Sequence, residues 1–288
     1  MRDVNPLRAA TNALATAVAL TGMRPPLTLP TRTHIDLRGK RVLLTGASSG
    51  IGAAAAQKFG AAGATVFAVA RRAELLDEVV DRIADAGGAA HAFPCDLSDL
   101  DAIDALMKDV GVVDILINNA GRSIRRPLEQ SLDRWHDVER TMTLNYYSPL
   151  RLIRGVAPGM LERGDGHIIN VSTWGVMNES VPLFAAYNAS KAALSTVSRA
   201  IETEWAPKGI KSTTLYYPLV ATPMIAPTRA YDGLPALSAE EAADWMIEAA
   251  RTRPVRIAPR IAMTARAVDT VAPGVVTGLM RRQGFQPG

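Results

Sequence analysis

Tyr187 and Lys191 are the two residues whose types and spacing best suit proton chemistry, and they stand four positions apart in Tyr187-Asn188-Ala189-Ser190-Lys191. Residues at positions i and i+4 share one face of a helix, so the phenol and the ammonium group should be neighbours. A phenol titrates near ~10, too high to exchange protons readily at neutral pH, and a nearby ammonium favours its ionised form. The spacing therefore indicates a tyrosine whose proton exchange is tuned by a lysine.

A glycine-rich segment follows the apolar run at residues 41–45 and leads into an alanine-rich stretch at 53–62; it reads Thr45-Gly46-Ala47-Ser48-Ser49-Gly50-Ile51-Gly52. Gly46 can make a tight exit from a strand, Gly50 lets backbone amides approach a pyrophosphate, and Gly52 lets the next helix pack closely on the sheet. The amino terminus of that helix favours negative charge. A plain tight turn is the alternative, but the position between strand and helix predicts a dinucleotide-binding loop that includes Ser48, Ser49 and Ile51.

The second predicted strand, at residues 65–70, is followed by Arg71 and Arg72. An NAD-binding unit usually has a carboxylate here for the ribose hydroxyls, and that carboxylate would repel a 2′-phosphate. Arg71, with Arg72 behind it, can instead form charge-assisted hydrogen bonds with the phosphate, which indicates NADP. A solvated helix start is the alternative interpretation. Asp96 and Leu97 follow the third predicted strand and are placed to contact the adenine.

The elements that must position these residues alternate from Lys40 onward between short β-branched apolar runs and longer stretches of helical period. This alternation predicts an α/β fold, with a single doubly wound Rossmann domain, a seven-stranded parallel sheet and helices on both faces. Ligands of such a sheet bind beyond the carboxyl ends of its strands, where the proline-rich segment 218–235 is a candidate lid. The predicted strands are residues 41–45, 65–70, 90–94, 114–117, 167–172, 211–216 and 255–258.

Five elements, in this order, resemble the short-chain dehydrogenase/reductase family over about residues 37–258: the glycine-rich loop at 45–52, Asn118-Asn119-Ala120-Gly121, Asn145, Ser172, and the Tyr187 to Lys191 segment. The resemblance implies hydride transfer to or from a nicotinamide while Tyr187 exchanges a proton with the substrate. It also implies that Lys191 holds the nicotinamide ribose.

The resemblance gives roles to the other matching residues. Ser172 closes the fifth predicted strand, where its hydroxyl can bond a carbonyl oxygen that becomes an alkoxide. Asn145, in a helix predicted at 133–160, resembles the family residue that holds a water leading protons to the lysine. Asn118 and Asn119 are expected to brace the sheet, and Asn119, Ala120 and Gly121 to line the cofactor.

The chain departs from the family pattern after the sixth predicted strand, where many members have Pro-Gly and this chain has Pro218-Leu219. Leu219 reduces the freedom of the backbone there and puts its path near the nicotinamide in doubt. Contacts of Pro218, Val220 and Thr222 with the cofactor are still expected.

The candidate substrate-pocket residues are all apolar: Trp174, Met177, Val181, Phe184, Met224 and Ile225. They favour a lipophilic aldehyde or ketone, such as a fatty-acyl, steroid or polyketide-like carbonyl. The sequence thus predicts an NADP-dependent carbonyl–alcohol oxidoreductase. A non-catalytic NADP-binding regulatory protein would be expected to lack part of the serine, tyrosine and lysine set, and a nucleotide-sugar epimerase or dehydratase would be expected to have a longer substrate domain.

The composition of the chain argues against several kinds of site and partner. The chain has 288 residues, a net charge of +4 and one cysteine, Cys95, so it cannot form an internal disulfide or a thiolate metal site, and a reducing cytoplasm is expected. No aromatic residues interleave with a basic run, so no nucleic-acid partner is expected. The four histidines, 34, 91, 136 and 167, lack the spacing of metal ligands, so no metal site is expected.

The chain ends lie outside the Rossmann domain that we expect at residues 37–260. Residues 1–36 are predicted to form an appendage with a helix at 6–23, and residues 261–288 a tail; both contain apolar residues with few charges. A subunit interface in a homodimer or homotetramer is the first expectation for them, and peripheral contact with a membrane, favoured by flanking arginines, is the second.

Overall fold

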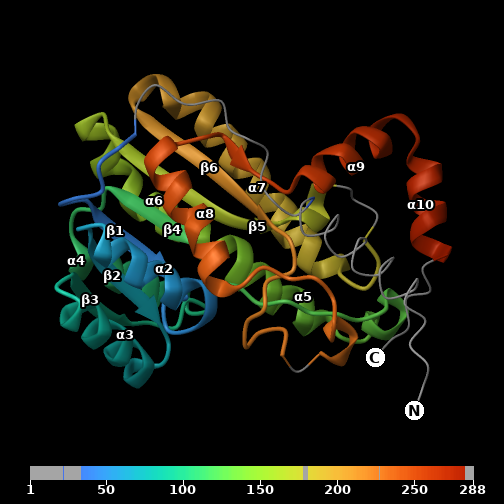
Figure 1. Cartoon of the computed structure of the whole chain (residues 1–288), viewed down its shortest axis with the longest axis horizontal. Coiled ribbons are helices and arrows are strands. Elements are labelled where there is room, and N and C mark those ends of the chain that lie inside the picture. Colours follow the sequence, from blue (N-terminus) through green and yellow to red (C-terminus); the bar gives the residue numbers. More distant parts are fainter. Residues whose placement is uncertain (1–21, 23–33, 178–180, 227, 283–288) are drawn as a thin grey trace, which may run out of the picture.

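One parallel sheet of seven strands runs through the described part of the chain, residues 22, 34–177, 181–226 and 228–282 of the computed structural model (Figure 1). The strand order is β3-β2-β1-β4-β5-β6-β7. This order confirms the predicted doubly wound Rossmann fold. The strands are β1 (Arg41–Thr45), β2 (Thr65–Ala70), β3 (Ala89–Pro94), β4 (Ile115–Asn118), β5 (Gly166–Thr173), β6 (Ile210–Tyr217) and β7 (Arg256–Ile257).

Helices cover both faces of the sheet, as predicted, and each face has its own apolar core (Figure 1). One core includes Phe59, Leu76 and Met246 from the helices α2 (Gly50–Ala61), α3 (Ala73–Asp85) and α8 (Ala239–Thr252). The other includes side chains from α4 (Leu100–Val110), α6 (Ser148–Arg163) and α7 (Ala185–Trp205). Strands buried on both faces explain why the predicted strands are continuous apolar runs.

The helix predicted at residues 133–160 is present as an unbroken helical stretch over residues 135–163, but it is not α-helical throughout. The structure has α5 (Trp135–Met142), a π-helical turn (Thr143–Tyr147) and then α6. Pro149 has no N–H, so the carbonyl of Asn145 cannot receive the bond that an α-helix would give it from four residues later. Ser148 Oγ donates to the Thr143 carbonyl oxygen at 2.7 Å, which helps to satisfy the widened turn. Such turns are frequent at functional sites.

The segment at residues 218–235, predicted as a lid, leaves the Rossmann domain and returns to it at adjacent points that are joined by two backbone hydrogen bonds. Ala221 N donates to the Leu237 carbonyl at 2.8 Å, and Leu237 N donates to the Leu219 carbonyl at 2.9 Å. Between these bonds the described residues are irregular except for a 3₁₀ turn at Arg229–Tyr231. A loop with closed ends is an Ω-loop, a form often found at functional sites. Its movement as a lid stays a prediction.

The chain ends are described only in part. The helix predicted at 6–23 lies outside the described residues apart from Gly22, and the tail contains α9 (Arg260–Val271) and α10 (Pro273–Arg282). None of the helices in the described ranges is long and apolar enough to cross a membrane. Assembly or membrane contact through the ends stays a prediction.

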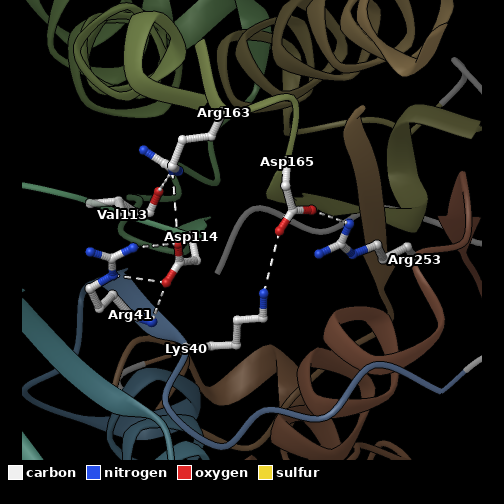
Figure 2. A network of polar contacts seen from close by, with 7 residues as sticks. All are labelled: Lys40, Arg41, Val113, Asp114, Arg163, Asp165 and Arg253. Atoms are coloured by element: carbon white, nitrogen blue, oxygen red, sulfur yellow. Dashed lines mark hydrogen bonds and ion pairs between the residues drawn. The ribbon is translucent and has the colours of Figure 1, made fainter. Parts of the chain in front are cut away.

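Ion pairs join the amino ends of the central strands, opposite the edge where ligands bind (Figure 2). Asp114 accepts from Arg41 Nε at 2.9 Å and from Arg41 Nη2 at 2.8 Å. Asp165 lies between Lys40 Nζ, at 3.3 Å, and Arg253 Nη1, at 2.8 Å. The contacts therefore connect β1 with the segments that enter β4, β5 and β7.

His167 lies in the same region and is fully buried in β5. Its Nε2 is 2.9 Å from Thr213 Oγ1, and burial lowers the pKa of the imidazole to about 3. The ring is therefore neutral and packed inside the sheet.

We predict that Asp114→Asn lowers the free energy of unfolding by about 1–2 kcal/mol at pH 7, because Arg41 loses its carboxylate while remaining partly exposed to water. Although burial raises it, the hydrogen bonds from Arg41 hold the pKa of Asp114 below its usual value. The stabilisation is therefore present above the unfolded pKa near ~3.9 and is lost as pH falls through the lower folded value. Denaturant titrations at pH 7 and below pH 4 measure both effects.

Asp104→Asn is the matched control, because Asp104 pairs with Arg151 between two exposed side chains. Such pairs contribute little, so the change should cost roughly 0.5 kcal/mol or less. Equal losses in the two variants would contradict a special role for the Asp114 pair.

Candidate active site

A cleft of about 740 Å³ opens at the carboxyl ends of the strands, where the fold places ligands. Every residue predicted to bind the cofactor lines it, and so do the predicted catalytic residues Ser172, Tyr187 and Lys191. Asn145 does not line it and is completely buried. The structure thus brings together segments that are distant in the sequence, in the arrangement that the motifs predicted.

The glycines of the first loop have the geometry that a phosphate-binding turn requires. Gly46 and Gly50 have φ values of +68° and +53°, in the region that favours glycine. A Cβ on Gly52 would lie 2.1 Å from the carbonyl oxygen of Gly46, closer than any real contact. The loop therefore closes on itself and presents the start of α2 to the cleft.

Thr45 and Asn119 hold this loop against the end of β4. The Thr45 hydroxyl donates to the Ile117 carbonyl at 3.1 Å and accepts from the amides of Asn119, at 2.9 Å, and Ala120, at 3.0 Å. Asn119 Nδ2 donates to the Thr45 carbonyl at 2.9 Å. The expectation that the asparagine-rich segment braces the sheet and lines the cleft agrees with these contacts.

Cationic side chains gather at the end of the cleft next to β2. Arg72 Nη2 lies 3.5 Å from both Ser48 Oγ and Ser49 Oγ, and Arg71 is exposed on the wall of the cleft. Asp96 is the only carboxylate among the described residues that line the cleft. The loop, the two arginines and the start of α2 together suit a phosphorylated dinucleotide.

Tyr187 and Lys191 lie on the first two turns of α7. Lys191 is buried, its Nζ donates to the Val171 carbonyl at 2.9 Å, and burial lowers the pKa of its ammonium to about 8. Burial also raises the pKa of Tyr187 to about 12, against a hydrogen bond with the Thr173 hydroxyl that acts in the opposite direction. The pKa of the phenol therefore lies above its ordinary value in this structure. The tuning of its proton exchange by Lys191 stays a prediction.

Asn145 stands one layer behind the lysine. Its Oδ1 accepts from Arg122 N at 2.9 Å, and its Nδ2 donates to the Arg122 carbonyl at 2.9 Å and to Ser190 Oγ at 3.0 Å. A Cβ on Gly121 would lie 3.2 Å from Asn145 Oδ1 and 3.3 Å from Lys191 Nζ. The π-helical turn thus places an amide that holds the backbone beside the lysine.

Two neighbouring hydroxyls at the end of β5 have different surroundings. Ser172 Oγ is 3.0 Å from Ser195 Oγ, about two turns along α7 from Tyr187, whereas the hydroxyl of Thr173 bonds Tyr187 itself. Successive side chains of a strand point in opposite directions, so only one of the two can face a given partner. The sequence analysis did not include Thr173 among the candidate site residues. The feature that could have indicated it is a second hydroxyl-bearing residue directly after Ser172.

Comparison with known proteins agrees with the motifs. The sequence model described as short chain dehydrogenase matches residues 40–232. The chain belongs to the short-chain dehydrogenase/reductase family. A fatty acyl-CoA reductase of Mycobacterium tuberculosis is 67% identical over 95% of this chain and 96% of its own length, and a fatty acyl-CoA reductase of Acinetobacter baylyi is 49% identical over 85% and 84%. A metagenomic short-chain oxidoreductase solved in complex with NADP is 32% identical, with a TM-score of 0.65 and coverage of 75% and 92%.

The substrate side of this short-chain oxidoreductase is apolar. Five of the six predicted pocket residues line the cleft, and the Ω-loop adds Tyr231 and Leu234. Met177 is the exception: it is buried against Tyr216, Ala258 and Ala262 of the core beneath α9. The lining residues are Trp174, Val181, Phe184, Met224 and Ile225.

Leu219 lines the cleft without the strain that its place in the pattern suggested. Among the described residues, the non-glycine residues with positive φ are Leu183 and Arg253, so Leu219 has an ordinary backbone conformation. Its carbonyl accepts the hydrogen bond from Leu237 N that closes the base of the Ω-loop. The path of the chain there therefore does not require glycine.

We predict that Gly52→Ala lowers stability by about 1–3 kcal/mol and weakens binding of a nicotinamide dinucleotide, because the new Cβ forces the loop away from the Gly46 carbonyl. Thermal unfolding and a fluorescence titration with the dinucleotide measure the two effects. Gly274→Ala in α10 is the control, since a Cβ there meets no atom within 4 Å. Indistinguishable behaviour of the two variants would show that the loop tolerates a side chain.

Proposed function

We propose that this oxidoreductase uses NADPH to reduce the carbonyl group of a fatty acyl thioester, with Tyr187 as the general acid. The observation that carries the proposal is the position of Tyr187 and Lys191 in a cleft that is cationic near β2 and apolar near the Ω-loop. The names of the two fatty acyl-CoA reductases, one of them 67% identical, support the substrate class.

The cofactor proposal rests on the chemistry of the lining. Bound NADPH would supply the hydride. The loop at residues 46–52 would take its pyrophosphate, with Ser48, Ser49 and Ile51 beside it, and Arg71 and Arg72 would take the 2′-phosphate that NADH lacks. Asp96 and Leu97 would contact the adenine, and Asn119 to Gly121, Pro218, Val220 and Thr222 would line the remaining length.

The proton chemistry requires a donor for the oxygen of the carbonyl group. The un-ionised Tyr187 would give its proton to the oxygen of the substrate carbonyl, and the Thr173 hydroxyl would bond the negative charge that develops on that oxygen. We assign this bonding role to Thr173 in place of Ser172, because Ser172 Oγ is engaged with Ser195. Lys191 and Asn145 would act as positioning residues near the phenol. The Lys191 ammonium bonds the Val171 carbonyl, and the Asn145 amide bonds the Arg122 carbonyl.

A thioester needs one step more than a ketone. After hydride addition, the oxygen returns its proton to Tyr187 as the carbon–oxygen double bond re-forms and the carbon–sulfur bond breaks. The products are an aldehyde and a thiolate, which takes a proton from water. Trp174, Phe184 and Ile225 would pack against the acyl chain. The half-exposed Met224 and Leu234 would contact the part of the chain that lies at the opening of the cleft.

The test is NADPH consumption with acyl-CoA substrates of rising chain length, with the aldehyde trapped and identified. We predict turnover that increases with chain length, and a Tyr187→Phe variant that loses roughly 10²–10⁴-fold in kcat while it still binds NADPH. Turnover of ketones but of no acyl-CoA would refute the substrate class. Binding of NADPH without turnover of any carbonyl would favour the non-catalytic alternative.

The two hydroxyls of β5 give a second prediction. Thr173→Val keeps the shape but removes the hydroxyl, and we expect a loss of roughly 10²-fold in kcat, as for other oxyanion donors, with Thr173→Ser largely active. Ser172→Ala should retain kcat within a few fold and instead lower the melting temperature, because Ser195 loses its partner. A large loss of kcat in Ser172→Ala with little loss in Thr173→Val would instead assign the bonding of the substrate oxygen to Ser172.

A further inference from the structure

Leu183 has a backbone conformation that leucine rarely adopts. Its φ value is +70°, in the left-handed region, and Arg253 is the other non-glycine residue with positive φ in the part of the chain that the structure describes. Arg253 ends α8, where a left-handed residue is common, whereas Leu183 stands just before the start of α7. A strained residue of this kind persists only where its surroundings hold it, and such residues cluster at functional sites.

A hydrogen bond from a neighbouring segment holds Leu183 in this conformation. Arg126 N donates to the Leu183 carbonyl at 2.8 Å. The guanidinium of Arg126 is itself paired with Asp137, a buried carboxylate of α5 that also accepts from Arg134 Nε at 2.9 Å. Pro182 restricts the chain from the other side, because its ring fixes its own φ. The turn is therefore held from outside the cleft, and Leu183 itself does not line the cleft.

The residues on both sides of this turn do line the cleft. Val181 lies before it and Phe184 after it, and both belong to the apolar substrate side. Phe184 is the N-cap of α7, its carbonyl accepts from Asn188 N at 2.7 Å, and the centre of its ring lies 6.1 Å from that of Tyr187. A change of φ at Leu183 would rotate the chain directly before Phe184. The turn therefore determines where the Phe184 ring stands in the wall of the cleft.

We propose that Leu183 is a positioning residue for substrate specificity: its left-handed backbone, held by Arg126, fixes Phe184 in the wall of the cleft and thereby sets the preference for chain length. This inference rests on the proposed function, in which Phe184 packs against the acyl chain. Each methylene buried against this wall contributes to binding, so a displaced wall should cost long chains more than short ones.

The test is the kinetics of the full chain with NADPH and two series of saturated substrates, from butanoyl-CoA to hexadecanoyl-CoA and from butanal to hexadecanal. Leu183→Ile keeps the volume of the side chain, but a β-branched residue is strongly disfavoured in the left-handed region. It should lower kcat/KM for the longest substrates roughly tenfold, mainly through KM, and leave kcat for the shortest within about threefold. Leu183→Gly removes the side chain but adopts the left-handed conformation freely, so it should restore most of the long-chain activity.

Leu161→Ile is the matched control, because Leu161 lies within α6, is partly exposed like Leu183 and does not line the cleft. It should leave the chain-length profile unchanged. Asp137→Asn should act in the same direction as Leu183→Ile, because Arg126 loses its buried carboxylate. Melting temperatures and NADPH dissociation constants check that each variant is folded and binds the cofactor.

Several outcomes overturn the inference. A native chain-length profile in Leu183→Ile would show that the backbone conformation does not set the preference, and a loss in Leu183→Gly as large as in Leu183→Ile would assign the effect to the side chain. An equal loss at all chain lengths would assign the turn to the stability of the fold.

Failure of the proposed function is told apart by the native chain. Turnover of acyl-CoA without any preference for length would leave thioester reduction standing and overturn the inference on Leu183. Turnover of aldehydes but of no acyl-CoA would refute the proposed substrate class, and the aldehyde series would still test Leu183.

Discussion

The arrangement of the cleft depends on the hydrogen-bonded joint between β1 and β4. One hydroxyl, that of Thr45, serves three backbone groups of the β4 end, and Asn119 returns a bond to the Thr45 carbonyl. On one side the joint fixes Gly46, against which Gly52 and the start of α2 close. On the other side it fixes the segment of Gly121, where an added Cβ would lie 3.2 Å from Asn145 Oδ1 and 3.3 Å from Lys191 Nζ. The glycine-rich loop and the surroundings of Lys191 are therefore placed relative to each other by a few buried hydrogen bonds at the ends of two strands.

Burial shifts the pKa values of Tyr187 and Lys191 in opposite directions, each toward the uncharged form of the side chain. The same loss of water that raises the pKa of Tyr187 to about 12 lowers that of Lys191 to about 8. A phenol with a raised pKa keeps its proton until a stronger base, such as an alkoxide, develops beside it. An anionic cofactor next to Lys191 would in turn favour the charged ammonium, so binding of the cofactor would prepare the lysine without ionising the tyrosine.

Most of the fold could be predicted from the sequence, because parallel strands buried on both faces are plain apolar runs. The bounds of β1 and β2 agree with the prediction, whereas β7 at the edge has only two residues, Arg256 and Ile257. The π-helical turn was missed because a missing N–H at Pro149 changes the register locally, without changing the apolar period. Ser172 and Thr173 could not be told apart, since adjacent hydroxyls face opposite sides of a strand whose orientation only packing reveals. Met177 was misplaced for a similar reason, because α9 covers it.

The cleft also separates charge from apolar surface along its length. Arg71 and Arg72 come from the end of β2, while Phe184, Met224 and Leu234 come from α7 and the Ω-loop. Tyr187 belongs to the apolar side, since the centre of its ring lies 6.1 Å from that of Phe184. It is also only about one helical turn from the buried side chain of Lys191. Under the proposed function, a dinucleotide with its phosphates held by the arginines would extend its reactive end toward this boundary. An acyl chain held by the apolar residues would meet it there, so the separation of charged from apolar lining would determine where the hydride and the proton are exchanged.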